Sequence, residues 1–116
     1  WFREQPELHL LFVHPPVPIG LALKHVPREV LDRYYREEGE AGLREAGELL
    51  SAASLPHTKH IHVGAPAETI VKVAHELGCE LICMGTHGRG AMTNAVVGSV
   101  VSRVLHITDI PVLVAR

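Results

Sequence analysis

Short apolar runs alternate with longer stretches of helical periodicity in this chain, and this alternation constrains the fold most strongly. The runs are continuous, which is typical of strands that are covered on both faces. Strands that alternate with helices favour a parallel sheet, whose right-handed crossovers place helices on both of its faces. The expected strands are residues 8–13, 60–63, 80–84 and 111–115, and the expected helices are residues 27–53, 66–77 and 99–107. The predicted fold class is therefore α/β, an open parallel sheet with helices on both faces.

The helix expected over residues 27–53 is amphipathic, with a Glu/Arg-rich face opposite an apolar one. Its expected buried residues are Leu31, Tyr34, Tyr35, Gly42, Ala46, Leu49, Leu50 and Ala53. Three glycines, Gly39, Gly42 and Gly47, each cost the helix about 1 kcal/mol relative to alanine. Packing against a sheet must therefore stabilise this helix.

Composition narrows the class of protein. With 47% hydrophobic and 21% charged residues, residues 1–116 are expected to form a single domain. The formal charge of −2 and the lack of a basic stretch argue against a nucleic-acid partner. The apolar runs are far shorter than the ~20 residues of a membrane span, and no signal peptide is expected. Cys79 and Cys83 are expected to be reduced core thiols, which favours a cytoplasmic location.

A glycine-rich loop follows the expected strand that ends at Met84 and Gly85. Ligands of open α/β sheets bind beyond the carboxyl ends of the strands. The helix that follows the loop begins near Ser99, and its unpaired N–H groups and positive dipole end favour an anion. The loop and the helix together predict an anion site, and phosphate is the simplest ligand for it.

Two common phosphate motifs do not fit this loop. The motif G-x-x-x-x-G-K-[ST] has its glycines at Gly85 and Gly90, but Ala91 stands where the lysine should be. The dinucleotide motif G-x-G-x-x-G begins at Gly88, but Thr93 replaces its third glycine. The loop therefore favours neither fast NTPase chemistry nor NAD binding.

The loop does match another pattern, in which Gly85-x-x-Gly88 is followed by nine residues and then by Gly98-Ser99. This G-2x-G-9x-G-[ST] spacing resembles the ATP-binding branch of the universal stress protein family. The resemblance extends from Leu8 to the end of the chain, through the turn at residues 63–68, the strand end at residues 81–88 and the last strand at residues 111–114.

The resemblance implies an adenine-nucleotide site built from Val13, Met84, Gly85, Gly88, Gly98, Ser99 and Val100. In the family's pattern the residue at Val13 lies by the adenine and the one at Met84 lines the same cleft. Gly85 and Gly88 lie near the ribose and phosphates, and residues 98–100 surround the phosphates. Arg89 in the loop is a further candidate, because its guanidinium can pair with phosphate oxygens. The alternative interpretation is that these glycines only form turns.

The chain departs from the family's pattern at its amino-terminal end. Family members usually begin with a strand that ends in an aspartate at the adenine, followed by a helix, and neither is found in these residues. In the family's strand order 3-2-1-4-5, within the flavodoxin-like layering of the adenine nucleotide alpha hydrolases, this first strand is central. We expect a central strand, not encoded here, between residues 8–13 and residues 80–84, since two long open edges would otherwise be exposed.

The favoured function is an ATP-binding module of the stress response with slow or no hydrolysis. A slow ATPase or autophosphorylating enzyme, which needs Mg²⁺ on the phosphates, is one alternative, and a nucleotide-free dimeric scaffold is another.

A homodimer is expected through the edge strand Pro111 to Ala115, as in the family's usual dimer. No catalytic triad is expected. Among the nine histidines, His60 and His62 share a strand face with His57 close by, but no cysteine or carboxylate completes a metal site.

Overall fold

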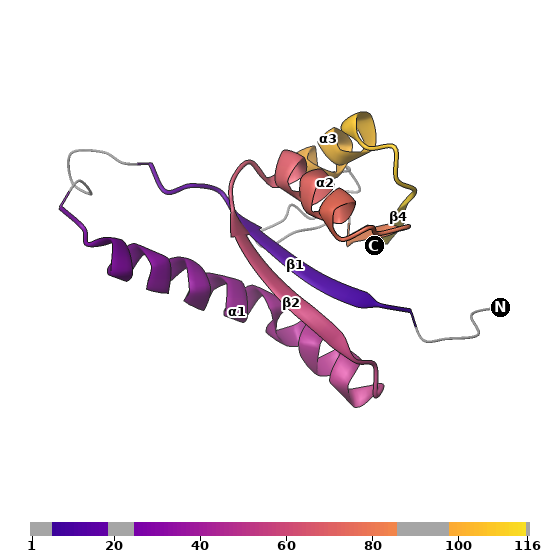
Figure 1. Cartoon of the computed structure of the whole chain (residues 1–116), viewed down its shortest axis with the longest axis horizontal. Helices are drawn as coiled ribbons and strands as arrows, with labels where there is room; N and C mark the ends of the chain where they lie inside the picture. Colours follow the sequence, from indigo (N-terminus) through magenta and orange to yellow (C-terminus); the bar gives the residue numbers. More distant parts are fainter. Residues whose placement is uncertain (1–5, 19–24, 86–97, 116) are drawn as a thin grey trace. The chain divides into compact units, whose positions relative to one another are not determined.

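The computed structural model describes residues 6–18, 25–85 and 98–115 of the chain (Figure 1). Its elements are β1 (Leu8–His14), α1 (Arg28–Ala52), β2 (His57–Val63), α2 (Pro66–Glu76), β3 (Ile82–Gly85), α3 (Ser99–Ile107) and β4 (Val112–Ala115). The predicted order of strands and helices and the α/β class are confirmed. The strand boundaries differ, because β2 begins three residues earlier than expected and β3 two residues later. None of the described helices is long and apolar enough to cross a membrane.

The chain divides into two compact units, Trp1–Val63 and Gly64–Arg116, which we call the first and second unit. In the first unit β1 pairs with β2, in parallel, from Leu8 opposite His57 to His14 opposite Val63. In the second unit β3 pairs with β4, also in parallel. The expected strand order would join β1 and β3 through a central strand. A further strand between them stays a prediction.

Helix α1 lies along β1 and β2, and glycines make the close approach possible (Figure 1). A Cβ on Gly42 would lie 2.5 Å from Cδ2 of Phe12, and one on Gly39 would lie 2.6 Å from Cγ2 of Ile61. The backbone of the helix therefore packs directly against this face of the two strands. The Phe12 and Ile61 side chains fit there only because Gly42 and Gly39 have no side chains.

The buried residues of α1 are Gly39, Leu43 and Gly47, so the predicted buried side is partly wrong. Tyr34 is 43% and Leu49 is 66% exposed, and Ala53 is also exposed. The reason is that apolar periodicity does not single out Gly39 and Gly47, whereas these two glycines are among the three positions that sit deepest against the sheet.

The core of the second unit is formed by α2, β3 and α3. Its buried members are Ala67, Ala74, Ile82 and Val104, and Val104 has no exposed surface. Helix α2 starts with Pro66 at its first position and is followed by Gly78 at φ +68°, a left-handed conformation that ends the helix as predicted.

The cysteines are both free thiols, but the expectation that both lie in the core is wrong for one of them. Cys79 is half-buried and packs against the core of the second unit, whereas Cys83 is exposed. The reason is the alternation of β3, which turns Ile82 and Met84 toward the core and Cys83 to the other face.

Candidate functional site

The end of β3 and the start of α3 are anchored to one core. Met84 on β3 and Val100 on α3 are both half-buried, and both pack against the cluster that contains Val104. Gly85 is the last residue of β3 and is exposed. The two ends of the predicted nucleotide loop are therefore held by the same packed residues. Gly88 and Arg89, the remaining loop residues of the predicted site, lie outside the described residues.

The amino terminus of α3 offers backbone donors that the helix itself does not use. The first backbone bond of the helix runs from the Ser102 N–H to the Gly98 carbonyl, at 3.0 Å. The N–H groups of Ser99, Val100 and Val101 precede it and have no partner within the helix. No side chain of the described residues caps this end. Ser99 is exposed, so its hydroxyl adds a fourth donor at the same end. Such an end binds anions.

Gly98 precedes α3 with φ −63° and ψ 157°. These angles are open to any residue, so backbone strain does not require glycine here. The backbone therefore also allows a β-branched residue at this position. Such a residue would act only by filling the room that glycine leaves beside the N–H groups of α3.

Val13 belongs to the first unit and is half-buried on β1, opposite His62 in the strand register. It lies on the strand face opposite that of Phe12, because side chains alternate along a strand. The predicted site residues thus divide between the units, with Val13 in the first and Met84, Gly85 and residues 98–100 in the second.

An aromatic cluster that sequence reasoning missed stands where β1 ends. The His14 ring centroid lies 5.5 Å from that of Tyr34 and 5.2 Å from that of Tyr35, both on α1. The Val17 N–H donates to the Tyr35 hydroxyl at 2.8 Å, and His14 Nδ1–H donates to the Pro15 carbonyl at 2.6 Å. These contacts fix the chain that leaves the carboxyl end of β1. The sequence signal was the pair Tyr34-Tyr35 on the helix that follows a proline-rich segment.

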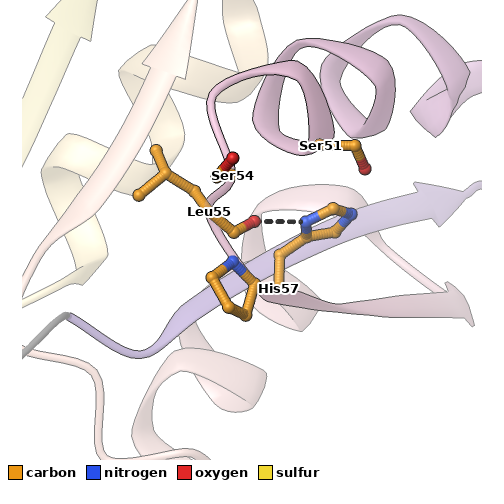
Figure 2. A pocket seen from close by; sticks show the side chains of 5 residues that line it. Ser51, Ser54, Leu55 and His57 are labelled. Carbon is orange, nitrogen blue, oxygen red and sulfur yellow. Dashed lines mark hydrogen bonds between the residues drawn. The ribbon is translucent and has the colours of Figure 1, made fainter.

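The histidines of β2 lie on both faces of the strand. His57 lies on the α1 side of β2, and its Nδ1–H donates to the Leu55 carbonyl at 3.0 Å (Figure 2). His60 instead meets His9 of β1, with 2.9 Å between His60 Nε2 and His9 Nδ1. Within residues 6–18, 25–85 and 98–115, no three His, Cys, Asp or Glu side chains are grouped so as to hold a metal ion.

A shallow hollow of about 450 Å³ lies at the carboxyl end of α1, lined by Ser51, Ser54, Leu55, Pro56 and His57 (Figure 2). It contains none of the predicted nucleotide-binding residues. Its lining is a wide-open surface with few convergent polar groups, unlike a small-molecule site. We therefore assign no ligand to it.

The model of the universal stress protein family matches residues 3–116. The chain belongs to this family. Among curated universal stress proteins, MJ0531 of Methanocaldococcus jannaschii is 32% identical over 89 residues, which are 76% of this chain and 52% of that protein. MJ0577 of the same organism is 41% identical over 56 residues, 48% of this chain and 35% of that protein. The matched segments thus span about half or less of the length of these relatives.

Solved structures of universal stress proteins share the fold. The structure of MJ0577, described as a structure-based assignment of biochemical function, has a TM-score of 0.77 at 28% identity and covers 99% of this chain and 78% of that one. The structure of UspA from Lactobacillus plantarum has a TM-score of 0.76 at 28% identity, with 98% of this chain and 80% of that one covered. The family predicted from the glycine spacing is confirmed.

Proposed function

We propose that this universal stress protein binds ATP along the segment from Gly85 to Val100 and acts as a nucleotide-binding module in the cytoplasm. The observation that supports this most is the amino terminus of α3. Its first N–H groups, which no side chain of the described residues caps, directly follow Gly98, the third glycine of the G-2x-G-9x-G-[ST] spacing. A phosphate group placed there accepts hydrogen bonds from backbone donors and meets the positive end of the helix dipole.

The same segment is poor in groups that accelerate hydrolysis. No lysine follows Gly90 to reach the terminal phosphates, and residues 85–100 contain no carboxylate or glutamine to orient an attacking water. The charge of the transition state is therefore weakly stabilised, and ATP bound there is held rather than turned over quickly.

Substitution of Gly98 tests the site. The Gly98→Val variant keeps ordinary backbone angles but places a β-branched side chain beside the donors of α3. We expect ATP affinity, measured by calorimetry, to fall by about tenfold or more, the equivalent of losing one or two charge-assisted hydrogen bonds. Ser102→Val, one turn further along α3 at an exposed position, is the control and should leave affinity unchanged. Equal ATP affinity in the parent and the Gly98→Val variant would exclude this site.

A phosphate-release assay with Mg²⁺ tests the second half of the proposal. The expected result is retained ATP with turnover far slower than that of ordinary enzymes, whose median is about 10 per second. Turnover of many per second would contradict the binding module and would show an ATPase faster than the slow-ATPase alternative. Purified protein that neither carries nor binds nucleotide would favour the dimeric scaffold.

We also propose that the protein is a homodimer joined at β4. In the part of the chain that the structure describes, β4 pairs only with β3, so its other edge is open. Leu113 on this strand is 56% exposed, and no charge interrupts the run from Pro111 to Ala115. An apolar edge strand without charged residues favours pairing with the same strand of a second copy, most simply across a two-fold axis.

A further inference from the structure

A chain of three side chains crosses from β1 to β2 on the strand face opposite α1. His9 Nε2–H donates to Oε1 of Glu7 at 3.1 Å, and His9 Nδ1 lies 2.9 Å from Nε2 of His60. The two imidazole centroids are 5.0 Å apart with their planes tilted by 39°. The His9 side chain is only 12% exposed, and the hydrogen bond between the two rings is half-buried.

The number of donors and acceptors on Glu7, His9 and His60 limits how many protons these three side chains can hold. With both imidazoles neutral, His9 gives its only N–H to Glu7, so its Nδ1 accepts from His60 Nε2–H. One added proton is tolerated, since one of the facing nitrogens still accepts. A second added proton puts an N–H on both facing nitrogens, which breaks the bond and sets two cations against each other at that distance.

We propose that the Glu7–His9–His60 chain is an acid-sensitive clasp between β1 and β2, which holds the strands together near neutral pH and is lost when both imidazoles become charged. The titratable groups on this face are His9 and Glu7 from β1 and the segment before it, and His60 and His62 from β2. Helix α1 packs on the opposite face, where the side chains of Lys59 and His57 meet Gly47. The nearest carboxylate, Glu7, is 83% exposed and compensates only one imidazolium weakly.

The environment of His60 agrees with this geometry. Burial lowers the pKa of His60 below its ordinary 6.5, and the neighbouring His9 and His62 lower it further. Because the folded state then binds a proton on His60 less readily than the unfolded state, the unfolded chain takes up more protons as the pH falls below 6.5. The stabilisation by neutral His60 is therefore complete above the unfolded pKa and decreases from there toward its lower folded pKa.

Nuclear magnetic resonance titration of the ring nitrogens tests the clasp in the parent chain. We expect His60 to titrate below pH 6.5, and we expect its pKa to rise toward 6.5 in the His9→Gln variant, which keeps a polar side chain without a charge. A His60 ring that titrates at 6.5 or above, or that ignores the His9→Gln change, would overturn the proposal.

Urea unfolding between pH 7.5 and 5.5 gives the second readout. The midpoint concentration should fall with pH in the parent and fall less in His60→Gln, since glutamine cannot be protonated. His25→Gln, at an exposed residue before α1, is the matched control and should follow the parent. Parallel profiles for the parent and His60→Gln would contradict the clasp. If His60→Gln does not fold, the ring titrations of the parent and His9→Gln decide.

Discussion

The glycines of α1 show how one residue type has different roles along one helix. Gly39 and Gly42 face the rigid side chains of Ile61 and Phe12 at distances that no real Cβ tolerates. Gly47 faces the flexible end of Lys59, with Cε 3.0 Å and Nζ 3.1 Å from the position of an added Cβ. Close approach is therefore essential at the first two positions and incidental at the third.

Alanine at these three positions should consequently change stability in opposite directions. Alanine favours a helix by up to about 1 kcal/mol over glycine. At Gly39 and Gly42 overpacking against Ile61 and Phe12 costs more, and we expect a net loss of about 1–3 kcal/mol in the free energy of unfolding. Gly47→Ala should gain a few tenths to about 1 kcal/mol, because the Lys59 side chain can move aside. Urea unfolding of the three variants decides the matter, and a stabilising Gly42→Ala would show that α1 does not pack on β1 as described.

Some site residues could be predicted from the sequence and others could not. The spacing of Gly85, Gly88 and Gly98 is local in the sequence, so the order of residues alone is sufficient to indicate the family. The contact between His9 and His60 depends on the parallel register of two strands 51 residues apart, and nothing in either local pattern encodes that register. The deep positions of α1 were missed for a related reason, since a glycine is buried only by what its partner strand presents.

At the scale of elements, helix α3 joins the core of the second unit to the proposed nucleotide site. Val104 is fully buried, whereas its neighbour Leu105 is 49% exposed. The helix start at Ser99 and the end of α2 before Gly78 were predictable, because glycine, proline and cap positions act locally. The strand ends were less predictable, because a strand extends as far as its partner pairs with it.

Truncation of these two neighbours separates core packing from helix propensity. Val104→Ala removes two methyl groups from a site without solvent contact and should cost about 2–3 kcal/mol of unfolding free energy. Leu105→Ala should cost about 1 kcal/mol or less, because half of that side chain is already in water. The reverse order in chemical unfolding would mean that α3 packs through its other face.

At the scale of the whole molecule, the proposed dimer depends on which backbone groups of β4 face its open edge. The Ile82 N–H donates to the Pro111 carbonyl at 2.9 Å, so Pro111 directs its backbone groups toward β3. In a parallel ladder successive residues point alternately to the two sides. Leu113 therefore also points toward β3, while Val112 and Val114 direct their N–H and C=O groups to the open edge.

Proline at Val114 should consequently block pairing at the open edge without cutting a bond between β3 and β4. Proline is tolerated on edge strands but lacks the N–H that a second copy of β4 would need. By light scattering at micromolar concentration we expect the parent to be a dimer and Val114→Pro a monomer with an unchanged circular dichroism spectrum. Val114→Ala removes most of the same side chain but keeps the outward N–H, so it should remain a dimer. A monomeric parent would refute the proposed dimer outright. A Val114→Pro variant that stays dimeric would argue against this contact, because it lacks one of the two N–H groups, those of Val112 and Val114, that β4 offers at its open edge.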